Sequence, residues 1–252
     1  MAPDPSRTVS DLAAFTQIMA YACLPAAGSL IGAILAEFAR PPRWVIGAAL
    51  HGAAGIAIAL ITVDLMPRVL AGLTVTAMLP AFFAGALASL GLAYGIRSLY
   101  RGRRQAVGAF MVYGAIGADL FADGLVTGAG SAAALSLGLL LAASQLVANI
   151  PGGYAAGANL HARVPSRRVR LITAALVTLP IFASAAGGYF LLREAAEPVQ
   201  SSALAFIIGL LMLTTIEDMV AEGDAPRPPR WSSTLAFAAG FVGLALVSSY
   251  LG

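Results

Sequence analysis

Long apolar runs, separated by short polar connections, occupy almost the whole chain. Eight of these runs are long enough to cross a bilayer as helices, because about 20 residues suffice for one crossing. They cover residues 16–38, 44–66, 72–96, 107–129, 132–159, 171–192, 201–221 and 231–250. The stretch 107–160 is too long for one crossing, so we expect it to turn at Gly128–Ser131. The pattern predicts an all-α, polytopic membrane protein whose residues 1–252 form a single transmembrane domain.

The composition agrees with this pattern and excludes a water-soluble domain. Hydrophobic residues make up 59% of the 252 residues and charged residues only 11%, and the mean hydropathy is +0.85. Soluble domains carry roughly 25% charged residues, so this chain has too few to cover a water-exposed surface. Cys23 is the only cysteine, which rules out a disulfide within the chain.

All fifteen basic residues are arginines, and their distribution predicts an orientation. Twelve lie in the connections after the first, third, fifth and seventh runs: Arg40, Arg43, Arg97, Arg101, Arg103, Arg104, Arg163, Arg167, Arg168, Arg170, Arg227 and Arg230. The opposite side has three: Arg7, Arg68 and Arg193. Because cytoplasmic loops are enriched in arginine, we expect both termini outside the cytoplasm. This topology explains the net charge of +3 better than nucleic-acid binding does.

A few polar side chains lie inside the predicted spans, where a charge costs at least a few kcal/mol. Asp119 and Asp123 are four residues apart and therefore share one helix face. At 1.5 Å of rise per residue, Asp119 lies roughly 18 Å from the inner end of its span, and Asn149 roughly 15 Å from the inner end of the next. Gln145 shares the face of Asn149, and Pro151 removes a backbone donor nearby, as in the broken helices of transporter sites.

These groups predict an oxygen-rich cation site at mid-membrane depth on the fourth and fifth spans. Asp119, Asp123 and Asn149 are its candidate ligands, and Gln145 is a further candidate. Carboxylate and amide oxygens are ligands that suit divalent cations such as Mg²⁺, Ca²⁺ and Mn²⁺. The alternative is that these side chains only form hydrogen bonds between helices.

Three other carboxylates are candidates for an ion pathway. Asp64 lies near the outer end of the second span and is either an entrance ligand or a solvated interfacial charge. Glu217 and Asp218, near the inner end of the seventh span, are either exit ligands or carboxylates that reach the interface. Four pairs of glycines fit close helix packing: Gly28/Gly32, Gly91/Gly95, Gly124/Gly128 and Gly153/Gly157.

Two short motifs carry a resemblance to a known family. The fourth span contains DLFADG at residues 119–124, and the fifth contains ANIPGG at residues 148–153. Together they resemble the paired HNFxDG and HNIPEG motifs of the ZIP (Zrt/Irt-like) divalent-metal transporters. Residues 55–67 are similar to the second span of that family, and residues 217–219 to the acidic pair of its seventh span. Eight spans with outside termini extend the resemblance over nearly the whole chain.

The resemblance implies a metal site on Asp119, Asp123 and Asn149, with metal entering near Asp64 and leaving past the acidic pair at 217–218. It also implies a ZIP-like helical bundle, often a homodimer. Several family ligands are missing, because alanine, glycine and leucine stand in their places at Ala148, Gly152 and Leu179. The remaining oxygen ligands support at most one metal position. They favour Mn²⁺, Mg²⁺ or Ca²⁺, while Fe²⁺ or Zn²⁺ with retained water stays open.

The leading hypothesis is therefore a membrane permease that imports a divalent metal cation, with no enzymatic activity and no cofactor. The alternative is a ZIP-derived membrane protein that has lost metal transport and handles another solute or acts through partners. An intramembrane aspartyl protease is disfavoured, because Asp119 and Asp123 share one helix and lack the expected Gly-x-Gly-Asp context. A composition rich in alanine, glycine and arginine, without lysine, suggests a bacterial inner membrane as the location.

Overall fold

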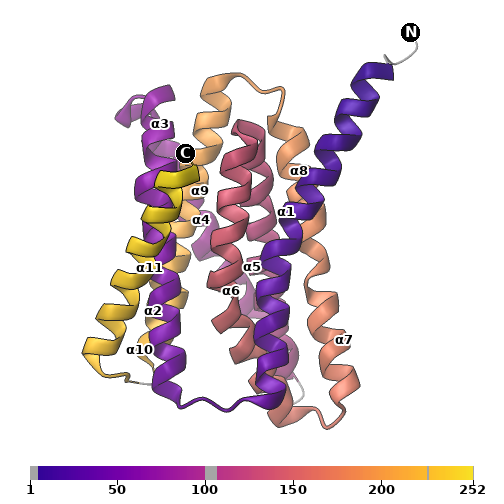
Figure 1. Ribbon diagram of the computed structural model, residues 1–252, viewed down its shortest axis with the longest axis vertical. Coiled ribbons are helices and arrows are strands. Elements are labelled where there is room, and N and C mark those ends of the chain that lie inside the picture. The colour runs from indigo at the N-terminus through magenta and orange to yellow at the C-terminus, as the bar shows by residue number, and fades with distance from the viewer. Residues whose placement is uncertain (1–4, 100–106, 226, 252) are drawn as a thin grey trace.

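The computed structural model describes residues 5–99, 107–225 and 227–251. Within these ranges helix is the regular secondary structure throughout, and no strand occurs. Figure 1 shows the helices standing side by side in one bundle, with short connections at its two ends. The predicted all-α class is confirmed. The α-helices are α1 (Pro5–Phe38), α2 (Arg43–Ala59), α3 (Met66–Gly72), α4 (Val75–Leu99), α5 (Val107–Ala133), α6 (Leu135–Arg163), α7 (Arg167–Val177), α8 (Leu179–Leu192), α9 (Glu197–Thr214), α10 (Ala221–Asp224) and α11 (Arg230–Leu251).

Two of the helices widen near one end into π-helical segments. α2 continues into η1 (Leu60–Leu65), and α9 continues into η2 (Thr215–Val220). π-Helical turns are rare in proteins, but those that occur are often found at functional sites. Both segments carry carboxylates that the sequence analysis selected, Asp64 on η1 and Glu217 on η2.

Seven described segments are long and apolar enough to cross a membrane, which confirms a multi-pass membrane protein. They are Leu12–Phe38, Arg43–Gly72, Val75–Gly95, Leu135–Arg163, Arg167–Leu192, Glu197–Asp224 and Arg230–Tyr250. α5, which corresponds to the predicted fourth span, stands beside α6 and α8 in the same bundle. The side chains of residues 107–115 at its start lie outside the described part of the structure.

The turn between α5 and α6 falls at Ala134, so the turn expected at Gly128–Ser131 is wrong. Ala134 has an extended backbone, with φ −161° and ψ 135°. Gly128 lies inside α5, where a Cβ atom would be 2.1 Å from the carbonyl oxygen of Ala185 on α8. The glycine therefore allows a close contact between two helices and does not end α5.

The packing of the bundle repeats with reversed direction. The most extensive contacts join α1 to α6, α8 to α5, α2 to α11, and α9 to α4. If α1 is exchanged for α8, α2 for α9, α4 for α11 and α5 for α6, the same contacts result. The α1–α6 pair becomes the α8–α5 pair, and the α2–α11 pair becomes the α9–α4 pair. Figure 1 shows that the exchanged helices run in opposite directions along the bundle. Inverted repeats of this kind are common in secondary transporters.

Glycines form the contact points of these helix pairs. A Cβ atom at Gly28 would lie 2.1 Å from the carbonyl oxygen of Leu146, and one at Gly153 would lie 2.1 Å from that of Ser29. Close approaches of this kind confirm three of the four predicted pairs: Gly28/Gly32, Gly124/Gly128 and Gly153/Gly157. At Gly91 and Gly95, a Cβ atom would have no described atom within 4 Å, so no close helix contact among the described residues involves this pair.

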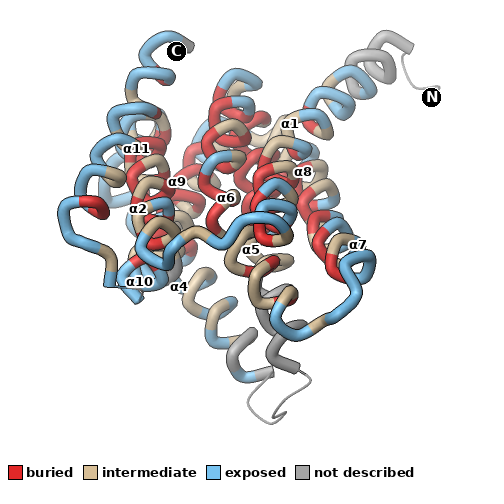
Figure 2. Tube along the Cα trace, turned by 60° about the horizontal axis from the view of Figure 1, so that its bottom comes forward, coloured by how far each residue is buried: buried red, intermediate tan, exposed pale blue. Residues whose placement is uncertain are grey.

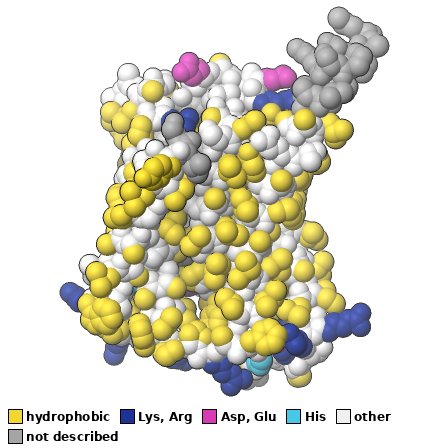
Figure 3. Space-filling model, viewed as in Figure 1, with side chains coloured by type: hydrophobic (Ala, Val, Ile, Leu, Met, Phe, Trp, Pro, Cys, Tyr) yellow, Lys and Arg dark blue, Asp and Glu magenta, His cyan; other side chains and the backbone are white. Residues whose placement is uncertain are grey.

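Buried residues gather along the centre of the bundle, while α4 and α11 are largely exposed (Figure 2). Exposed apolar side chains such as Phe83 and Leu87 on α4 suit contact with lipid. Arginines gather at the lower end of the bundle in Figure 3, where α1 meets α2, α6 meets α7, and α10 meets α11. We call this the arginine-rich end.

The close contact between α1 and α6 generates a prediction about stability. Gly153→Ala places a methyl group against the backbone of Ser29, so we expect unfolding to become easier by about 1–3 kcal/mol. Gly91→Ala is the matched control, because open space surrounds that position and alanine favours helix. Thermal unfolding of the purified protein in detergent would measure both variants. Equal melting temperatures for the two variants would contradict the packing described here.

Candidate cation-binding site

Asp123 is the central polar side chain of the bundle. It projects from α5 and is 7% exposed. Gln145 Nε2 donates a hydrogen bond to Asp123 Oδ1 at 2.9 Å, and Asn149 Nδ2 donates to Asp123 Oδ2 at 2.6 Å. The two amides lie four residues apart on α6, so one helix face presents both to the carboxylate. Each carboxylate oxygen thus has a hydrogen-bond donor.

Neighbouring groups fix the orientation of the two amides. Thr127 Oγ1 donates to Gln145 Oε1 at 3.0 Å, so the amide oxygen of Gln145 points to Thr127 and its NH₂ group points to Asp123. Asn149 Nδ2 also lies 3.4 Å from the carbonyl oxygen of Pro25 on α1. In this arrangement Gln145 acts on Asp123 as a donor that positions the carboxylate.

Pro151 leaves α6 continuous, contrary to the broken helix that the sequence suggested. α6 remains helical from Leu135 to Arg163 with Pro151 inside it. Proline removes one backbone donor, but the remaining bonds and the packing of α1 against α6 support the helix around it. The amides of α6 are therefore held on a regular helix.

Asp119, Asp123, Gln145 and Asn149 converge on one small cavity, which we call the chamber. Its volume is about 30 Å³, which suffices for one or two water molecules. The structure thus brings together the four residues that the sequence selected at this depth. The rest of the wall comes from α2, η1, α5, α6, α9 and η2, and comprises Ile56, Ala57, Leu60, Ala122, Ser144, Ala148, Leu210, Leu211, Thr214, Thr215 and Met219.

A larger cavity of about 500 Å³, the vestibule, adjoins the chamber. Asp119 and Asn149 belong to the walls of both cavities. From them the vestibule extends to Asn159 and Glu222, which lie near the ends of α6 and α10. Both helices end at the arginine-rich end, so the vestibule connects the chamber with that side of the bundle.

The opposite half of the bundle is closed by apolar packing. Leu60 of η1, Val126 of α5, Leu141 of α6 and Ile208 of α9 are each at most 2% exposed and belong to one cluster. This cluster lies on the side of Asp123 away from the arginine-rich end. The chamber is therefore accessible from one side of the bundle.

The cavity walls carry only negative formal charges among the described residues. Asp119 and Asp123 line the chamber, and Glu222 lines the vestibule, whereas no arginine or histidine belongs to either described wall. A cleft lined by one sign of charge concentrates ions of the opposite sign. The arrangement favours a cation and disfavours an anion.

Two of the three positions at which the ZIP resemblance would place a further ligand lie in these cavity walls. Ala148 lies in the walls of both, and Gly152 lies in the wall of the vestibule. A Cβ atom at Gly152 would have no described atom within 4 Å. Water has room to occupy the place of a side chain there.

Two of the three predicted pathway carboxylates, Asp64 and Glu217, line neither cavity. Ser248 Oγ on α11 donates to Asp64 Oδ1 at 2.5 Å, and the buried Asp64 Oδ2 accepts no hydrogen bond from the described residues. Glu217 is exposed on η2 and belongs to neither wall. The side chain of Asp218 lies outside the described part of the structure. Thr214 at the end of α9 and Thr215 at the start of η2 line the chamber instead. The available sequence signal was an apolar run that ends in two threonines.

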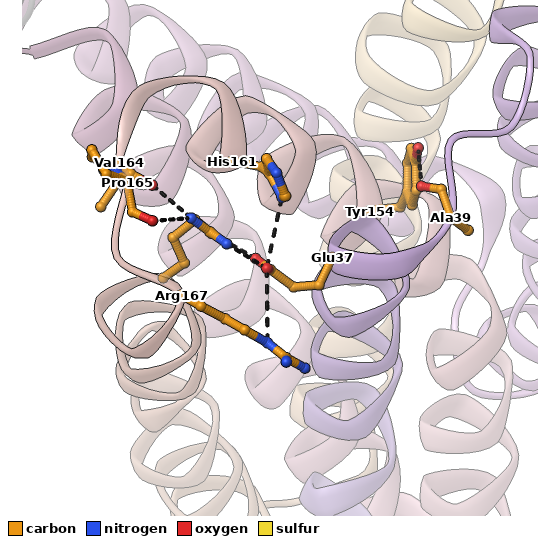
Figure 4. A network of polar contacts seen from close by, with 8 residues as sticks. Glu37, Ala39, Tyr154, His161, Val164, Pro165 and Arg167 are labelled. Carbon is orange, nitrogen blue, oxygen red and sulfur yellow. Dashed lines mark hydrogen bonds and ion pairs between the residues drawn. The ribbon is translucent and has the colours of Figure 1, made fainter.

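A second polar cluster joins α1 to the connection between α6 and α7 (Figure 4). Arg170 donates to Glu37 through Nε at 2.6 Å and through a terminal nitrogen at 2.5 Å. Arg170 also donates to the carbonyl oxygens of Val164 and Pro165. The Glu37 side chain is 4% exposed, and His161 Nδ1 lies 3.6 Å from it. This cluster fixes the end of α1 and was not expected from the sequence.

No protein-family model matches this chain, and no curated protein matches it in sequence. Among the described residues, no three histidine, cysteine, aspartate or glutamate side chains group closely enough to hold a metal ion on their own. A cation in the chamber would therefore need amide, hydroxyl or water oxygens in addition to carboxylates.

The cluster around Glu37 generates a second prediction. Glu37→Gln leaves the buried Arg170 charge without its carboxylate, and we expect a loss of about 3 kcal/mol of stability. Glu194→Gln is the control, because Glu194 is 78% exposed beside Arg193 and such pairs contribute little. Chemical denaturation in mild detergent would compare the two. A Glu37→Gln protein as stable as the control would refute the structural role of the cluster.

Proposed function

We propose that the chain is a permease that imports a divalent cation through the chamber between α5, α6, α9 and η2. The observation that supports this most strongly is the charge of the cavity walls. Asp119, Asp123 and Glu222 contribute negative charge, and the described walls contain no positive side chain although the chain has fifteen arginines. Two carboxylates in one chamber match the charge of a divalent ion.

The arginine distribution supports the direction of transport. We assign the arginine-rich end to the cytoplasm, because cytoplasmic loops of membrane proteins are enriched in arginine. With eight crossings both termini then lie on the other side, and Figure 1 has the free ends of α1 and α11 at the same end of the bundle. The vestibule opens to the cytoplasm in this orientation, so the conformation is the one that releases an imported ion.

Alternating access requires a second conformation in which the other half opens. The inverted packing of the first three and last three spans supports such a pair of states. In inverted repeats, each repeat can adopt the conformation of the other, and this opens the site to the opposite side of the membrane. The apolar cluster with Leu60 and Val126 would then separate, and the vestibule would close. When no ion occupies the chamber, Gln145 and Asn149 compensate the buried charge of Asp123. This lowers the free-energy cost for the empty protein to change back to the outward-open conformation.

The resemblance to the ZIP transporters supports the same residues as metal ligands. In their motifs, the positions of Asp119, Asp123 and Asn149 hold ligands of a mid-membrane metal site. The same resemblance favours a ZIP-like bundle, a homodimer, and a location in the cell membrane. Glu217 and Asp218 would act on the cytoplasmic side of this pathway, and Asp64 on the outer side.

A second candidate function is a membrane protein that handles another solute or acts through partners. It is favoured by the composition of the chamber, which has two carboxylates but no third carboxylate or imidazole among the described residues. No three described side chains of these types form a metal-binding group. It is also favoured by Asp123, whose two oxygens already accept hydrogen bonds from amides. Transport measurements separate the two candidates.

Ion uptake into vesicles that contain the purified protein tests the proposal. With Mn²⁺, Mg²⁺, Zn²⁺, Fe²⁺, Co²⁺ and Cd²⁺ offered separately, we expect accumulation of at least one ion above empty vesicles. Asp123→Asn keeps the shape but removes the charge, and uptake should fall at least about tenfold. Glu194→Gln serves as the control and should transport normally, since this carboxylate is exposed outside the cavities. If the folded protein accumulates none of the six ions, metal transport is excluded in favour of the second candidate.

A further inference from the structure

Three residues that line the chamber carry hydroxyl groups, and each hydroxyl donates a hydrogen bond to the backbone of its own helix. Ser144 Oγ donates to the carbonyl oxygen of Leu141 at 2.7 Å, and Thr215 Oγ1 donates to that of Leu211 at 2.7 Å. Thr214 Oγ1 donates in the same way to Leu210 at 2.9 Å. A hydroxyl has one hydrogen, so an oxygen whose hydrogen is engaged offers only lone pairs. These wall oxygens are therefore acceptors.

The donors around the chamber are engaged as well. The NH₂ groups of Gln145 and Asn149 point to Asp123, as described above. The Thr214 hydroxyl has a second partner, because Ser89 Oγ lies 3.1 Å from it. Among the described residues, Ser144 and Thr215 have no such second hydroxyl partner. They are 5% and 1% exposed, respectively. The chamber is thus lined by residues that carry carboxylate oxygens on α5 and acceptor hydroxyl oxygens on α6 and η2.

We propose that the chamber is a site for a hard divalent cation of the Mn²⁺ and Mg²⁺ class, with Ser144 and Thr215 as neutral oxygen ligands in addition to Asp119 and Asp123. This inference rests on the proposed function and names the substrate class of the same site. Carboxylate, hydroxyl and water oxygens suit Mg²⁺ and Mn²⁺, whereas zinc prefers imidazole and thiolate. The thioether of Met219 is the one soft donor in the described wall of the chamber.

The two cavity volumes support the replacement of water by these oxygens. The vestibule, at about 500 Å³, has room for a cation with its complete first shell of water. The chamber, at about 30 Å³, has room for only one or two groups the size of a water molecule, since each needs about 10–15 Å³ of such volume. An ion that moves from the vestibule into the chamber must exchange most of its water for wall oxygens. Ser144 and Thr215 supply neutral oxygens for that exchange.

An oxygen-to-sulfur substitution tests the assignment of Ser144. Ser144→Cys changes a hard donor into a soft one with little change in shape, so Mn²⁺ affinity should fall about tenfold and Cd²⁺ affinity should rise. Ser131→Cys is the matched control: Ser131 is 3% exposed, donates to the Thr127 carbonyl at 2.7 Å, and lines neither cavity. Equilibrium dialysis of the full-length protein in lipid nanodiscs, with Mn²⁺ and Cd²⁺, measures both variants.

Substitutions of Thr215 provide a second, independent test if the Ser144→Cys protein does not fold. Thr215→Val removes the hydroxyl at similar volume and should weaken Mn²⁺ binding about tenfold, whereas Thr215→Ser should retain it. The inference is overturned if the wild type binds Mn²⁺ but the Ser144→Cys and Thr215→Val proteins bind Mn²⁺ and Cd²⁺ as the wild type does. That outcome leaves the proposed function intact. A wild type that binds no divalent cation rejects both the inference and the proposed function.

Discussion

A carboxylate buried at the centre of a membrane bundle must have its charge compensated, and the structure around Asp123 follows from this requirement. Gln145 and Asn149 each donate to one of its oxygens, and Thr127 fixes the direction of the first amide. The second amide also reaches the carbonyl oxygen of Pro25, so the network joins α5, α6 and α1. Losing such donors would leave a buried charge without partners, which costs several kcal/mol in apolar surroundings.

The close packing of the helices makes this network possible. Gly28 and Gly153 bring the backbones of α1 and α6 together, which places Pro25 within reach of Asn149. The cluster at Glu37 fixes α1 at its C-terminal end. Apolar packing closes the bundle on one side of the chamber, and the vestibule opens it on the other. A polar centre with one closed and one open side is the arrangement expected of one state of a transporter.

Much of this arrangement could be predicted from the sequence, because helical periodicity and depth are properties of a single segment. The spacing of Asp119 and Asp123, and the matching depth of Asn149, predicted that they would meet. Side-chain direction was not predictable, so the turning of Gln145 toward Thr127 and the orientation of the hydroxyls of Ser144 and Thr215 needed the structure. Glu37 and Arg170 are 133 residues apart, and no local pattern indicates their pairing. Gly91 and Gly95 share the spacing of packing glycines, but spacing alone does not indicate which helix face meets a neighbour.

The central claim is that the chamber beside Asp123 binds a cation. The most direct measurement is a crystal structure of the protein soaked in Mn²⁺, with an anomalous difference map that locates the metal independently of the protein atoms. We predict one strong peak inside the chamber, in contact with the Asp119 and Asp123 carboxylates. A well-ordered chamber without a peak at saturating Mn²⁺, with or without manganese bound elsewhere on the protein, would contradict it.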